Sequence, residues 1–78
     1  MSRLTTGAIK LRLYVRRHGW TLERLGVELG VSKQQASRLL LGQRGPSIVT
    51  ASRVETVTSG EVRAADWAHP ARRELLVA

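Results

Sequence analysis

The chain has no cysteine among its 78 residues and only two prolines. Without cysteine it can form no disulfide bond, no thiolate nucleophile and no thiolate-ligated zinc site, so its stability must come from helix packing, with or without oligomerisation. No apolar run approaches the ~20 residues that span a bilayer, and the N-terminal sequence lacks the apolar stretch of a secretion signal. We therefore expect a cytoplasmic protein with no membrane partner.

Groupings of catalytic or metal-binding side chains are also missing. The six acidic residues are scattered and form no carboxylate pair, and the two histidines, His18 and His69, lie far apart with no metal-ligand spacing around them. A chain of this length is one small domain, too short to hold both a substrate pocket and a scaffold for catalytic groups. We expect no enzyme, no metal and no cofactor, and assign both histidines to packing or capping.

Positive charge, in contrast, is abundant. Thirteen Lys and Arg residues face six Asp and Glu residues, which gives a formal net charge of +7, and eleven of the thirteen cations are arginine. Such an excess attracts polyanions, and the forked guanidinium group suits phosphates and guanine edges. Nucleic acid is the favoured partner, while an anionic membrane surface or the absence of any anionic partner remains open at this point.

Helical periodicity, hydroxyl caps and glycine stops predict an all-α chain with helices at about 8–18, 22–29, 33–41 and 48–58. After Gly60, residues 61–70 form either a short extended stretch or one helical turn, with Val62 and Trp67 returning to the core. Trp20 and Trp67 flank helices, so we assign them to the core and not to base stacking. The tail 71–78 either frays or packs on a second subunit. The residues expected to face inward are Leu11, Tyr14, Val15, His18, Leu22, Leu25, Leu29, Ala36, Leu39, Leu40, Ile48, Ala51, Val54 and Val57.

A glycine turn joins the second and third helical patterns. Gly30 ends the second helix, and Ser32 with Gln35 forms a capping box that begins the third. Gly26 lies on the side that meets the third helix, where a missing side chain lets two backbones approach. The alternative is a weak position in a helix that costs ~1 kcal/mol relative to alanine. We favour the close approach and expect only glycine or alanine there.

Four polar side chains point away from the predicted core on the third helix: Lys33, Gln34, Ser37 and Arg38. A glutamine amide can form two hydrogen bonds with adenine, and lysine and arginine donate to the two acceptors of guanine. The alternative interpretation is an ordinary solvated helix face.

The run LERLGVELGVSKQQASRLLLG, followed by GPS and a fourth helix, resembles the helix-turn-helix of the Cro and lambda-repressor superfamily. The stretch RVETVTSGEVRAADW is similar to the end of small phage-encoded Cro-like regulators, and the resemblance covers about residues 11–70. It implies a compact bundle of four to five helices, with a DNA-binding domain at 1–70 and the motif at 21–42. It also implies base reading by Lys33, Gln34, Ser37 and Arg38, with Ser32 facing phosphate.

Two residues depart from the family pattern. Leu22 stands where many members place a glutamine that contacts phosphate, and Leu41 stands where others place a polar residue. We therefore expect the phosphate contacts to come from other polar groups, and Leu41 is a candidate protein contact. For one of these polar groups, Arg44, the alternative is a loop residue in solvent. The expected phosphate-binding residues are Thr21, Arg24, Ser32, Gln43, Arg44 and Ser47.

The resemblance implies a sequence-specific regulator of transcription that binds double-stranded DNA through the major groove. A Cro-like repressor that binds an operator as a homodimer fits best, because one such module reads too few base pairs for useful specificity. Activation through contact with RNA polymerase uses the same fold. The alternative function is a protein-interaction module, such as an anti-activator, antitoxin or adaptor, that uses the helix-turn-helix surface.

Overall fold

A hydroxyl side chain caps the start of every α-helix in the computed structural model, which describes residues 5–42 and 45–68. Thr5, Thr21, Ser32 and Ser47 each accept a hydrogen bond from the backbone N–H three residues later, at 3.0–3.2 Å. These bonds satisfy amide groups that have no partner within the helix. The elements are α1 (Thr6–His18), α2 (Leu22–Leu29), α3 (Lys33–Leu41), α4 (Ile48–Val57) and a 3-10 helix, η1 (Ala64–Ala68).

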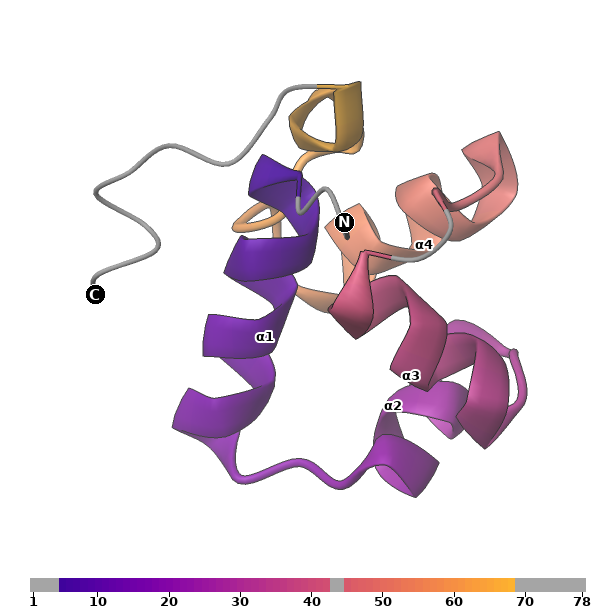
Figure 1. Ribbon diagram of the computed structural model, residues 1–78. Coiled ribbons are helices and arrows are strands. Elements are labelled where there is room, and N and C mark those ends of the chain that lie inside the picture. The colour runs from indigo at the N-terminus through magenta and orange to yellow at the C-terminus, as the bar shows by residue number, and fades with distance from the viewer. Residues whose placement is uncertain (1–4, 43–44, 69–78) are drawn as a thin grey trace.

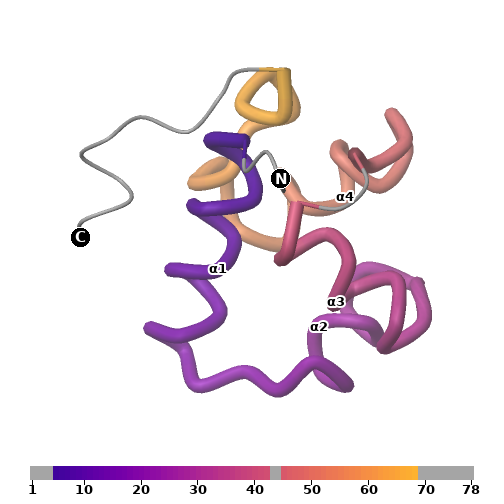
Figure 2. Tube along the Cα trace, in the orientation of Figure 1, coloured from indigo at the N-terminus to yellow at the C-terminus, as the bar shows by residue number. Residues whose placement is uncertain are grey.

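The helices surround one small apolar core. In Figure 1, α1 stands on one side, α2 and α3 lie together on the other, and η1 lies beside the start of α1. The tube in Figure 2 shows the same path, with α4 leading back from α3 toward η1. The predicted all-α bundle of four to five helices is therefore confirmed. The core consists of Leu11, Val15, Leu25, Leu29, Ala36, Leu39, Val54 and Val62, with Trp20, Val31, Leu40, Val57 and Trp67 packed around it.

Two inward assignments were wrong. Ile48 is 88% exposed, although Ala51 and Val54 on the same helical stripe are buried. Ile48 is the first residue of α4, whose start lies at the edge of the molecule away from α1 (Figure 1), and burial on this stripe begins one turn later, at Ala51. His18 is exposed as well, and its ring packs against that of Tyr14 with centroids 4.2 Å apart. This confirms the packing role assigned to His18.

The segment after α4 returns across the core. The Thr58 hydroxyl is buried, donates to the carbonyl oxygen of Val54 at 2.8 Å and accepts from the Val62 N–H at 3.1 Å. Val62 is fully buried, and Trp67 in η1 lies directly over Gly7 of α1. Both residues are therefore core anchors, as predicted, and residues 64–68 form a single short helix.

An ion pair ties η1 to α1. Lys10 Nζ lies 3.1 Å from Asp66 Oδ2, which also accepts a hydrogen bond of 2.9 Å from the Arg63 N–H. Burial alone would raise the pKa of Asp66, but the Arg63 N–H and the Lys10 ammonium together hold that pKa below its ordinary value. Asp66 is therefore ionised in the folded chain at neutral pH.

Several expectations concern residues outside the described part of the chain. These are the roles of Gln43, Arg44 and His69 and the two alternatives for the tail 71–78. Within residues 5–42 and 45–68, no helix is long and apolar enough to cross a bilayer.

Candidate nucleic-acid interface

The turn between α2 and α3 fixes the angle at which the two helices meet. Gly30 ends α2 with φ 69° and ψ 31°, a left-handed conformation that residues with side chains rarely adopt. The Gly30 N–H donates to the carbonyl of Val27 at 3.3 Å, and the Val31 N–H donates to that of Gly26 at 2.9 Å. The chain therefore leaves α2 in one defined direction and enters α3 three residues later.

Gly26 lies against the backbone of this turn. A Cβ atom added to it would be 2.8 Å from the carbonyl oxygen of Val31 and 3.4 Å from the carbonyl carbon of Ser32. The close-approach interpretation is therefore confirmed. Alanine, which we expected to be accepted, would itself displace the turn, because a backbone oxygen cannot move aside as a flexible side chain can.

The start of α3 is held by a complete capping box. The Ser32 hydroxyl accepts from the Gln35 N–H, and the Gln35 side-chain oxygen accepts from the Ser32 N–H, both at 3.1 Å. This reciprocal pair confirms the predicted helix start and prevents fraying of the first turn. The side chains of that turn therefore project from a rigid backbone.

One side of α3 is buried and the other is open. Ala36 is fully buried and Leu39 is 6% exposed, so the helix packs on the core along this line. The predicted base-reading residues lie on the remaining surface: Lys33, Gln34 and Arg38 are exposed and Ser37 is half-buried. The four side chains thus share the outward side of one helix, in its first two turns.

Ion pairs hold two of the predicted DNA-contacting cations. Lys33 Nζ lies 3.6 Å from Glu23 Oε1, and Arg24 Nε lies 3.2 Å from Glu28 Oε2. The Arg24 guanidinium also stacks over the Trp20 ring, 4.9 Å from its centroid. Arg38 has no ion-pair partner in the described part of the chain, so it is the predicted cation most readily available to an incoming anion.

The hydroxyl groups expected to bind phosphate are already used as helix caps. Thr21, Ser32 and Ser47 accept backbone N–H groups, which leaves the hydroxyl hydrogen of Thr21 and Ser32 as a donor. The Ser47 hydroxyl, in contrast, donates its hydrogen to the Thr50 hydroxyl at 3.1 Å, so that hydrogen is already used. An anion near Ser47 would therefore meet the amide groups at the start of α4 and not the serine hydroxyl.

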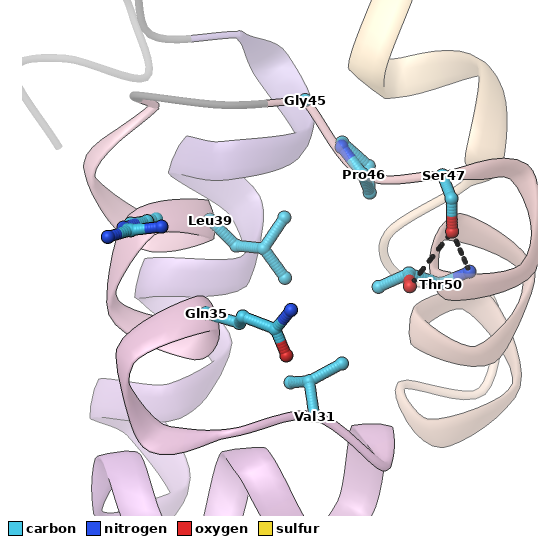
Figure 3. A pocket seen from close by; sticks show the side chains of 8 residues that line it. Val31, Gln35, Leu39, Gly45, Pro46, Ser47 and Thr50 are labelled. Atoms are coloured by element: carbon cyan, nitrogen blue, oxygen red, sulfur yellow. Dashed lines mark hydrogen bonds between the residues drawn. The ribbon is translucent and has the colours of Figure 1, made fainter.

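A hollow of about 280 Å³ lies between α3 and the start of α4. Figure 3 shows Gln35 and Leu39 of α3 on one side and Ser47 and Thr50 of α4 on the other, with Val31 between the two helices. Arg38 also lines it, so an outward cation and the N-terminus of a helix border one concave surface. The sequence placed Gln35 only as a cap and did not single out Thr50.

Sequence reasoning also missed the two carboxylates that pair with Lys33 and Arg24. It treated Glu23 and Glu28 as scattered acids, although Glu28 is four residues after Arg24 on one helix, a spacing that favours an ion pair. The ion pair of Glu23 with Lys33 joins two helices, so it could be found only once the geometry of the turn between them was known.

Comparison with known proteins gives one match. A family model described as helix-turn-helix matches residues 11–59, more than half of the chain. No curated protein and no solved structure matches the chain significantly. The matched region contains α2, the glycine turn and α3, together with most of α1 and all of α4.

Proposed function

Because this chain belongs to the lambda-repressor and Cro-like helix-turn-helix superfamily, whose domains are DNA-binding regulators, we propose that it is a sequence-specific, Cro-like transcriptional repressor. It binds an operator in double-stranded DNA as a homodimer, with α3 in the major groove. The base-reading residues are Lys33, Gln34, Ser37 and Arg38.

One observation carries this proposal: the first two turns of α3 present polar side chains on the side opposite the buried Ala36 and Leu39. A helix that reads DNA needs its donors at one end, at a fixed angle to the rest of the domain. The capping box and the contact at Gly26 supply that rigidity. Lys33 and Arg38 donate to guanine acceptors and Gln34 pairs with adenine.

The phosphate contacts surround this helix. On the α2 side, the proposed phosphate-binding groups are Arg24 and the hydroxyls of Thr21 and Ser32. On the α4 side, they are the backbone amides that follow Ser47. Gln43 and Arg44 are part of the proposal through their sequence positions alone. Two copies are needed, because half-sites about one helical turn apart give a specificity that a single module lacks. Repression then follows from occlusion of a promoter.

The test is selection of bound sites from a random duplex pool, followed by titration of the winning site and a scrambled duplex at one salt concentration. We expect a palindromic site, two chains per duplex and a steep decrease in affinity as the salt concentration rises, because phosphate contacts release counterions. Failure to enrich any sequence, with no salt-dependent affinity for either duplex, would refute the proposal.

A second function is favoured by exposed apolar side chains. Leu41 at the end of α3 is 46% exposed, and Ile48 and Val49 at the start of α4 are 88% and 70% exposed. These residues suit a protein-interaction module, or an activator that contacts RNA polymerase. The same titration discriminates the first of these, since a module that binds only protein shows little DNA affinity at low salt.

A further inference from the structure

An ion pair links the first turn of α2 to the first turn of α3. Glu23 Oε1 lies 3.6 Å from Lys33 Nζ, and the two side chains are 77% and 61% exposed. A pair this open contributes little to stability, because solvent screens it and two long side chains lose freedom. Its importance therefore depends on what it does to Lys33 at the proposed DNA surface.

Lys33 occupies a position that is unfavourable for a cation. The N-terminus of a helix carries partial positive charge, so an acidic side chain is preferred there, yet the first turn of α3 contains no acid. Helix stability does not explain a lysine at this position. Glu23, from the neighbouring helix, supplies the negative charge that α3 itself lacks.

We propose that Glu23 is a specificity-determining residue: its carboxylate holds the Lys33 ammonium at the start of α3 and keeps it from neutralising the phosphates of unmatched DNA. The inference rests on the proposed function, because it concerns how the same surface discriminates between sequences.

The chemistry of the ammonium group explains the discrimination. An ammonium has three hydrogens to donate, so Lys33 can stay beside the Glu23 carboxylate and still donate to the two acceptors of a guanine edge. A phosphate, in contrast, competes for the whole charge of the ammonium. Moving Lys33 to a phosphate leaves the Glu23 carboxylate unpaired beside an anionic backbone, which is unfavourable. The ion pair therefore opposes random binding more than it opposes binding to a matched site.

The experiment is a double-mutant cycle with Glu23→Gln and Lys33→Gln, titrated on the selected operator and on a scrambled duplex over a salt series. Glu61→Gln is the matched control, since it removes the same charge from a pair with Arg17 of α1. For Glu23→Gln we expect scrambled-duplex affinity to rise by about threefold to tenfold, with a salt slope steeper by about one unit. Operator affinity should change less, so the ratio of operator affinity to scrambled-duplex affinity falls.

In the Lys33→Gln background, the same Glu23→Gln change should alter scrambled-duplex affinity less than about twofold, because the residue acts through Lys33. Equal tightening in both backgrounds, or tightening matched by Glu61→Gln, would mean a general charge effect and would overturn the inference. No change on the scrambled duplex would overturn it as well. If the parent chain binds neither duplex, the proposed function fails and the inference fails with it. Melting curves confirm that every variant is folded.

Discussion

Substitution of Gly26 by alanine tests the geometry on which the DNA-binding surface depends. In an ordinary helix this change stabilises by about 1 kcal/mol, because glycine loses more backbone entropy on folding. Here the new Cβ would lie 2.8 Å from the Val31 carbonyl oxygen, closer than real Cβ atoms approach, and the obstacle is backbone. Overpacking of this kind costs about 1–3 kcal/mol. Taking the upper half of that range, we expect a net destabilisation of about 1 to 2 kcal/mol.

The assay is equilibrium denaturation with a melting curve, in which each 1 kcal/mol corresponds to about 4–8 °C for a chain of this size. Gly45→Ala is the matched control, because a Cβ there would meet nothing within 4 Å. That control should be neutral or more stable by up to about 1 kcal/mol. Gly26→Val, with a branched side chain, should lose at least about 2 kcal/mol. A Gly26→Ala chain as stable as its parent would refute the close approach of α2 to the turn.

Three further predictions concern other parts of the molecule. Arg38→Ala should weaken operator binding by about 1–3 kcal/mol and leave scrambled-duplex affinity nearly unchanged in paired titrations, whereas the control Arg16→Ala, on the last turn of α1, should change neither affinity. Gly7→Ala should lower the melting temperature by displacing Trp67, whose ring atoms lie 2.5–2.9 Å from the position of the new Cβ, at a cost of about 1–3 kcal/mol. The pKa of Asp66 is lowered by folding, so the unfolded chain binds more protons and stability is lost as pH falls below about 4. Asp66→Asn should flatten that part of a melting profile measured from pH 3 to 6, and an unchanged profile would contradict the assignment.

Local signals made the helix-turn-helix predictable from sequence. Thr21, Ser32 and Gly30 each act within three or four residues of their own position, through caps and a left-handed turn. Such interactions depend on backbone geometry that neighbouring residues already define, so the helix bounds and the outward direction of Lys33 and Arg38 followed from spacing.

Burial that depends on elements far apart in the sequence was not predictable in the same way. Helical periodicity placed Ile48 on the stripe of Ala51 and Val54, and that stripe is real, but periodicity says nothing about where the neighbouring helices end. On α4, burial extends toward the N-terminus only as far as Ala51. At the start of α1, periodicity made no inward assignment, yet Gly7 and Ile9 are buried, and Trp67, far along the chain, lies over Gly7.

The charged side chains on the proposed DNA surface were predictable in part from local sequence, and in part only from the packing of the helices. Counting residues gave an excess of cations, and the outward side of α3 gave their location, but neither showed that Lys33 and Arg24 are already paired with carboxylates. An ion pair between two helices appears only after the turn has brought Glu23 beside Lys33. The count of cations alone therefore overstates what this surface offers to a phosphate backbone. Of the predicted cations in the described residues, Arg38 alone has no carboxylate to leave before it contacts DNA, so its removal should produce the largest loss on the matched site.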